Sequence, residues 1–139
     1  MARPKELDLK TVWLFSSCSP SELRTIRSSL EEITVPAGKV LCEEGTVGRE
    51  FFVIVEGTAD VVRDGKTIAT LGPGGHFGEL ALLDHKPRSA SVVSVSDLTV
   101  LVLGQREFNG VLEAVPTIAR KLLAAMATRL RESDTKALH

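Results

Sequence analysis

The 139-residue chain is poor in aromatic side chains, with five Phe, one Trp and no Tyr. Proteins that bind single-stranded nucleic acid stack bases on aromatic rings, so this scarcity disfavours that class. The formal net charge is only −1, which gives no long-range attraction toward nucleic acid. No run approaches roughly eighteen apolar residues, and the opening residues contain no apolar signal region. We therefore expect a mature, soluble chain with no membrane segment and no direct nucleic-acid binding.

Cysteine and histidine are scarce too. Cys18 and Cys42 lie too far apart in sequence for a metal-binding knuckle. They could form a disulfide, but two buried thiols in a reducing cytosol is the favoured interpretation, and it predicts a cytoplasmic protein. His76 and His85 are expected in solvent-facing loops, since no closely spaced His pair with a carboxylate is present. Without a nucleophile motif or a paired acid and base, the sequence predicts a binder with no metal and no cofactor, not an enzyme.

The two ends of the chain have helical patterns. Residues 19–22, Ser-Pro-Ser-Glu, form a capping box with proline at the first helical position, which predicts an amphipathic helix over Pro20–Leu30. Leu7–Phe15 is expected to form another short helix that offers an apolar pad. After Leu103 a helix is expected, and Pro116 begins a second one. The second helix has an apolar stripe of Ile118, Leu122, Leu123, Met126 and Leu130.

Between these ends, short runs rich in Val, Ile, Phe and Thr are separated by Gly and Pro. The Asp-Gly pair at 64–65 suits a tight turn that needs positive φ, and so predicts a β-hairpin. Many short strands at this spacing indicate a sandwich or barrel. The expected strands are Glu32–Val35, Val40–Cys42, Glu50–Val55, Thr58–Arg63, Lys66–Leu71, Ser89–Val95 and Leu98–Leu103.

The segment 77–92 interrupts this β pattern. Gly78–Leu83 is compatible with a helix, whose unpaired N–H groups would suit a phosphate, and Gly78 lets the backbone approach a ligand. Arg88, ten residues after Gly78, can add a bidentate, charge-assisted contact. Glu79 would repel an anion, but it makes sense if the ligand also carries a sugar hydroxyl. Together these residues indicate a nucleotide monophosphate.

The same segment resembles the phosphate-binding cassette of the cyclic-nucleotide-binding domain family, which includes catabolite activator protein and the regulatory subunit of cyclic-AMP-dependent kinase. The carrying motifs are Phe-Gly-Glu-Leu-Ala-Leu-Leu at 77–83 and Pro-Arg-Ser-Ala-Ser-Val at 87–92. The resemblance extends from about Leu14 to Arg131. It implies one domain over 1–139 that is mainly β with flanking helices. Residues 1–31 would be N-terminal helices, 32–104 an eight-stranded β-roll (jelly roll) holding the cassette, and 105–139 a C-terminal helix pair.

The resemblance also implies a role for each matching position. Glu79 would accept a hydrogen bond from the ribose 2′-hydroxyl, and Arg88 would pair with the phosphate. By its position along the last helix, Ser133 would contact the base. The backbone of Gly78, Leu80 and Ala81 would surround the ribose and cyclic phosphate, Ser89 and Ala90 would complete the cradle, and Val62, Leu71 and Leu80 would be apolar neighbours of the base. The implied ligand is cyclic AMP, with cyclic GMP as the alternative because the Ser89 hydroxyl could reach a guanine amino group.

Two positions depart from the family pattern. Arg49 stands where an aspartate often orients the phosphate arginine, and Thr46 replaces a common acidic residue. Glu50 could substitute, but its strand parity would point it elsewhere, so weaker binding is expected. The C-terminal helix is expected to close over the base and to form a homodimer seam, with folding back on its own roll as the alternative to the seam. The chain would thus be a cyclic-nucleotide receptor; the alternatives are the sensor portion of a transcription regulator or other larger protein, and a ligand-free dimerisation module.

Overall fold

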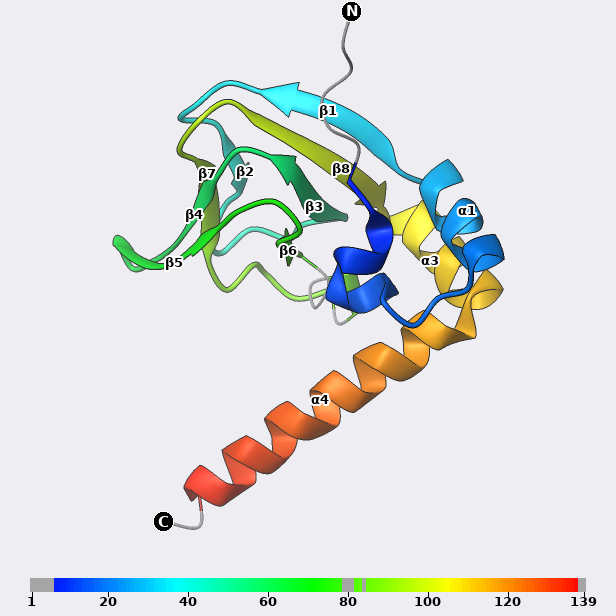
Figure 1. The fold of residues 1–139 in the computed structure, drawn as a ribbon. Coiled ribbons are helices and arrows are strands. Elements are labelled where there is room, and N and C mark those ends of the chain that lie inside the picture. Colours follow the sequence, from blue (N-terminus) through cyan, green and yellow to red (C-terminus); the bar gives the residue numbers. More distant parts are fainter. Residues whose placement is uncertain (1–6, 79–81, 84, 138–139) are drawn as a thin grey trace, which may run out of the picture.

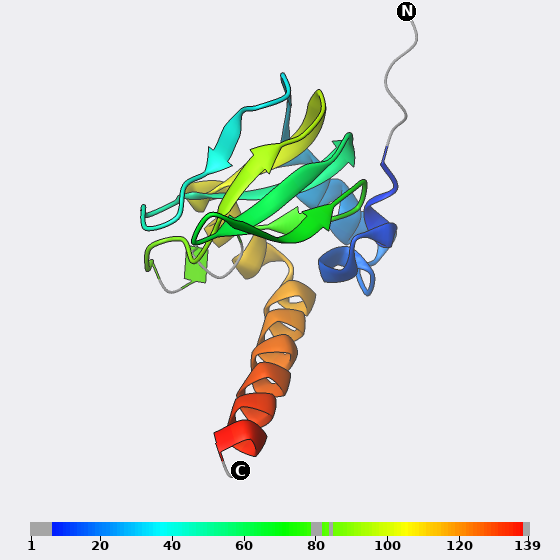
Figure 2. The same ribbon diagram turned by 90° about the vertical axis from the view of Figure 1, so that its left-hand side faces the viewer.

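Two four-stranded antiparallel sheets form the centre of the computed structural model (Figures 1 and 2). The structure describes residues 7–78, 82–83 and 85–137, apart from the side chains of Arg129 and of residues 133–137. The strand order is β1-β8-β3-β6 in one sheet and β2-β7-β4-β5 in the other. The strands are β1 (Glu31–Val35), β2 (Val40–Cys42), β3 (Glu50–Glu56), β4 (Ala59–Arg63), β5 (Lys66–Leu71), β6 (His76–Phe77), β7 (Ser91–Ser94) and β8 (Leu98–Gly104). The expected mainly β architecture with eight strands is confirmed.

Strand β3 is apolar on both faces. Its five consecutive residues from Phe51 to Val55 are all buried. Successive side chains of a strand point to opposite faces. Phe51 and Val53 belong to a core shared with the helices, whereas Phe52 and Ile54 belong to a core shared with the second sheet. The run is therefore buried because β3 lies between two layers.

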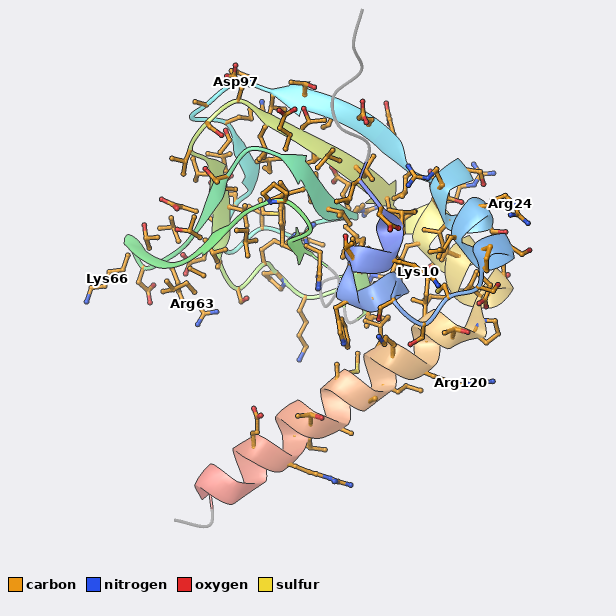
Figure 3. The ribbon with its side chains drawn as sticks, viewed as in Figure 1. Lys10, Arg24, Arg63, Lys66, Asp97 and Arg120 are labelled. Carbon is orange, nitrogen blue, oxygen red and sulfur yellow. The ribbon has the colours of Figure 1, made fainter. Side chains whose placement is uncertain are left out.

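The Asp-Gly hairpin is confirmed. Asp64 and Gly65 have φ values of 51° and 77°, and they join β4 to β5, where Arg63 pairs with Lys66. Figure 3 labels Arg63 and Lys66, which flank the turn of this hairpin. Positive φ at both central positions is the geometry that matches the twist of a two-residue hairpin.

The predicted strand list needs two corrections. It missed β6, whose two residues pair with Phe52 and Val53 of β3, because a run this short carries no alternation signal. The run Ser89–Val95 forms a strand only over Ser91–Ser94. Ser89 and Ala90 form a bend before it, as the chain leaves the cassette.

The N-terminal helices differ in part from the prediction. The capping box of Ser19 and Glu22 is confirmed, but helix α1 covers Pro20–Ser28 rather than reaching Leu30. Leu7–Phe15 does not form one helix. It contains two 3₁₀ helices, η1 (Leu9–Thr11) and η2 (Trp13–Phe15), because Val12 between them is extended. Leu14 and Phe15 are buried in the core, whereas Trp13 is 43% exposed.

The C-terminal helices are α3 (Gln105–Ala114) and α4 (Pro116–Ala137). Both ribbon views show α4 leaving the cluster of α1, α3 and the 3₁₀ helices and extending away from the sheets (Figures 1 and 2). Its first turns are anchored: Ile118 and Leu122 are buried, and Lys121 Nζ donates to the carbonyl oxygen of Trp13 at 2.8 Å. Leu123 and Leu130 are 64% and 65% exposed. The alternative, in which the helix folds back on its own roll, does not describe this structure.

Neither α4 nor any other helix in the described part of the chain combines the length and the apolar character that a membrane crossing would require. Cys18 and Cys42 are both buried and free, so they form no disulfide with each other. His76 was expected in a solvent-facing loop, and this prediction is wrong. It is a half-buried residue of β6, and its ring stacks on that of Trp13 at 6.1 Å between centroids. His85 is exposed with a φ of 56°.

Candidate phosphate-binding segment

The segment that was singled out in the sequence begins directly after β6. Gly78 has a φ of +100°, a conformation that glycine adopts without strain. A Cβ atom at Gly78 would lie 2.6 Å from both Arg88 Nη1 and the carbonyl oxygen of Glu50, so the position also has no room for a side chain. Leu82 and Leu83 are helical. Glu79, Leu80 and Ala81 lie outside the described residues, so their expected contacts with a ribose and phosphate stay predictions.

Arg88 is held inside the protein, with 8% of its surface exposed. Its Nη1 donates to the carbonyl oxygen of Gly78 at 3.1 Å, and its Nη2 donates to the carbonyl oxygen of Glu50 at 2.7 Å. Its Nε–H group is buried and has no hydrogen-bond partner among the residues that the structure describes. A buried donor without a partner is costly, and a bound acceptor would remove that cost.

The backbone of Arg88 is fixed as firmly as its side chain. Its N–H donates to the carbonyl oxygen of Thr46 at 2.7 Å, and its carbonyl oxygen accepts from the N–H of Gly45 at 2.9 Å. An antiparallel bridge joins Val47 to Pro87 beside these bonds. The turn at residues 45–47 therefore fixes the position of the Arg88 backbone, although the turn lies some forty residues earlier in the sequence.

The partners of Arg88 are not those that the sequence suggested. The side chains of Arg49 and Glu50 are both exposed. The backbone carbonyl of Glu50, rather than its carboxylate, orients the guanidinium. Sequence reasoning missed this acceptor because it searched among side chains, and it also missed Gly48, against whose backbone the guanidinium lies. A glycine just before the unexpected arginine was the available signal.

The far end of the segment is tied to the β4–β5 hairpin. Ser89 is exposed, and its carbonyl oxygen accepts a hydrogen bond from Arg63 Nε at 3.0 Å. Ala90 is half-buried. Ser91 Oγ accepts from the N–H of Glu44 at 2.9 Å. These bonds join the segment to the end of strand β4 and to the turn at Glu44, both of which come much earlier in the sequence.

Two of the candidate neighbours of the base, Val62 on β4 and Leu71 on β5, lie on the same sheet but do not pair with each other. Val62 pairs with Ser91 of β7 and with Thr67 of β5, whereas Leu71 pairs with Ala59. Leu71 packs against the core between the two sheets. Ser133 belongs to α4, but its side chain is outside the described residues. Helix α4 extends away from the roll (Figure 1).

The positive charge of Arg88 also acts on a neighbouring thiol. Burial raises the pKa of Cys42 to about 11, and the charge of Arg88 opposes that rise. The thiol is therefore neutral at physiological pH. Within the described ranges, no three His, Cys, Asp or Glu side chains gather into a group that could hold a metal ion. The chemistry on offer is recognition of an anion by a buried cation.

These features are those of a known family, and the comparison is direct. A profile of the cyclic nucleotide-binding domain matches residues 32–115, well over half of the chain. The chain belongs to the cyclic nucleotide-binding domain family. The matched region includes both sheets, the segment 77–92 and helix α3.

Two curated relatives illustrate the range of proteins that contain this domain. The chain is 34% identical over 126 residues to the cyclic AMP receptor protein of Thermus thermophilus, covering 87% of this chain and 58% of that protein. It is 39% identical over 121 residues to a cAMP-dependent protein kinase regulatory subunit of Aspergillus niger, covering 86% of this chain and 29% of that protein. The chain thus spans well under two thirds of the length of these relatives.

Solved structures support the same assignment. The catabolite activator protein of Thermus thermophilus superimposes with a TM-score of 0.81 at 34% identity, over 90% of this chain and 61% of that one. The N-terminal domain of a transcriptional regulator from Streptomyces coelicolor superimposes with a TM-score of 0.79 at 31% identity, over 95% of this chain and 96% of that one.

Proposed function

We propose that this domain is a non-catalytic receptor for a cyclic nucleotide, cyclic AMP in preference to cyclic GMP. Residues 77–92 would bind the ligand, and Arg88 would pair with its phosphate. The proposal treats 1–139 as one binding domain, with N-terminal helices over 1–31, the roll over 32–104 and C-terminal helices over 105–139. It also assigns the domain to the cytoplasm, where free thiols are the usual state.

The observation that carries the proposal is the state of the Arg88 guanidinium. A buried arginine normally has a carboxylate partner, because an unpaired buried charge is costly. Within the described part of the chain, Arg88 instead donates to two neutral carbonyl oxygens and keeps a buried Nε–H without a partner. A phosphate anion would supply both the missing acceptor and the missing negative charge.

The remaining roles follow from the family pattern. Glu79 would accept from the ribose hydroxyl, which would separate a nucleotide from inorganic phosphate. Ser89 and Ala90 would complete the cradle, and Val62 and Leu71 would contact the base. Helix α4 would close over the ligand from its extended position, with Ser133 near the base. The preference for cyclic AMP is supported by the similarity to the cyclic AMP receptor protein and to the cAMP-dependent protein kinase regulatory subunit.

Calorimetric titration of the purified chain tests the proposal. Cyclic AMP should bind with one site per chain and cyclic GMP should bind more weakly. AMP, which has the same base and sugar but a dianionic, uncyclised phosphate, is the control and should bind weakest. If the folded chain gives no heat with either cyclic nucleotide, and neither one raises its melting temperature, the receptor proposal is wrong.

A second candidate is that the domain is the sensor portion of a longer transcription regulator. It is favoured by the match to the Streptomyces coelicolor regulator domain, which the alignment covers almost completely. In that case α4 would pass the signal to a neighbouring domain, and its exposed Leu123 and Leu130 would contact a second copy of the chain. Both candidates share the ligand-binding step, so they differ only in what α4 moves.

A further inference from the structure

Gly48 is a glycine that the course of the backbone does not require. Six other glycines of the described chain have positive φ, between 77° and 100°, but Gly48 is not among them. An alanine could therefore adopt the backbone conformation of Gly48 without strain. Some other feature must explain why a side chain is absent here.

That feature is the guanidinium of Arg88. A Cβ atom built on Gly48 would lie far inside van der Waals contact with the Nε, Cζ and Nη2 atoms of Arg88, and these are its three nearest neighbours. The guanidinium of Arg88 therefore occupies the space that a side chain at position 48 would need. Gly78 limits the opposite end of the group, since a Cβ there would lie 2.6 Å from Nη1.

A flexible arginine could usually move aside for an added methyl group, but this one is held at both ends. Its backbone makes hydrogen bonds with Gly45 and Thr46, and its two terminal nitrogens bond the carbonyl oxygens of Gly78 and Glu50. Moving the guanidinium breaks at least one of the terminal bonds. It also moves the unpaired Nε–H from its place.

We infer that Gly48 is a positioning residue for ligand binding. Because it has no side chain, it leaves a space, here called the seat, that holds the guanidinium of Arg88 in place. This inference rests on the proposed function only where it concerns the ligand. The seat compensates for the acidic residue that Arg49 replaces, because steric confinement and two backbone carbonyl oxygens hold the arginine in place. Gly48 thus determines affinity through Arg88 and touches no ligand itself.

The first test needs no ligand. Gly48→Ala should lower the melting temperature of the otherwise wild-type chain by about 4 °C or more, which is typical of a clash in a packed site. In an Arg88→Ala background the same substitution should change it by less than about 1 °C, because the obstacle is gone. Equal shifts in both backgrounds would overturn the inference, since Gly48 would then be needed for a reason other than Arg88.

The second test is calorimetric titration with cyclic AMP. Gly48→Ala should lower the affinity at least about tenfold, and it should add nothing to the loss caused by Arg88→Ala. Gly110→Ala is the matched control, because a Cβ at Gly110 meets no atom within 4 Å and φ is not positive there. Unchanged affinity in a folded Gly48→Ala chain would also overturn the inference. A wild-type chain that does not bind would refute the receptor proposal, while the thermal test would still decide the seat.

Discussion

Replacing Arg88 by alanine should separate ligand binding from folding. The change removes a cation that is 92% buried and that already uses two of its nitrogens on carbonyl oxygens (8% is exposed). For binding, it deletes the buried Nε–H donor and the positive charge that would face a phosphate. A charge-assisted contact of this kind contributes about 2–4 kcal/mol, so affinity for cyclic AMP should fall about thirtyfold to seven-hundredfold.

Folding should suffer much less. The substitution removes the hydrogen bonds that Arg88 donates to the carbonyl oxygens of Gly78 and Glu50, but water can enter the space that the side chain vacates. It also removes a buried charge whose partners among the described residues are neutral carbonyl oxygens, which offsets part of the loss. We expect the free energy of unfolding to fall by less than about 1.5 kcal/mol, a small part of the stability of an ordinary domain.

Calorimetric titration measures the affinity, and thermal unfolding of the same samples measures the stability. Arg49→Ala is the matched control, because it removes the same charge from an exposed neighbouring position and should leave the affinity nearly unchanged. Arg88→Lys should give an intermediate loss, since an ammonium keeps the charge but not the planar donor geometry. A folded Arg88→Ala chain that binds cyclic AMP as tightly as the wild type would refute the reasoning.

Three further predictions concern α4 and the buried thiols. Amides of residues 117–133 should exchange more slowly with saturating cyclic AMP, because the helix closes from its extended position; equal exchange would contradict the closure. Leu123 and Leu130 are exposed, so the chain should dimerise through α4. The double variant Leu123→Lys with Leu130→Lys should then be only monomeric in sedimentation velocity. A wild-type chain that stays monomeric at high concentration, with and without ligand, would exclude the dimer seam. Burial raises the pKa of Cys42 to about 11, above its value of about 8.5 in an unfolded chain. Because the thiol of the unfolded chain ionises first, the contribution of Cys42 to the free energy of unfolding should be complete below about pH 8.5 and should fall as pH rises toward 11. Denaturant titrations should show that Cys42→Ala makes this decline shallower, with the remainder due to Cys18, whose pKa burial also raises.

Much of the fold could be predicted from local patterns. The capping box at Ser19 and the Asp-Gly turn at 64–65 are local signals, because their geometry depends on residues within one turn of the chain. The long apolar strands were also predictable, since burial on either face demands apolar residues. Strand β6 was not, because its two residues become a strand only by pairing with β3. The two 3₁₀ helices likewise follow from how Leu14 and Phe15 pack into the core.

The sequence by itself determined which chemistry the domain carries: an arginine within a glycine-containing segment, without catalytic or metal-binding patterns. Only the tertiary structure decided how that arginine is held, because its partners are backbone groups that any sequence would contain. The carbonyl of Glu50 comes thirty-eight residues before Arg88, and the role of Gly48 depends on an atom that is absent. The path of α4 was also decided in three dimensions. Its apolar stripe is the same whether it covers the roll or extends from it. In the structure, its first turns are anchored, for example by the hydrogen bond from Lys121 to Trp13, and the helix extends away from the sheets.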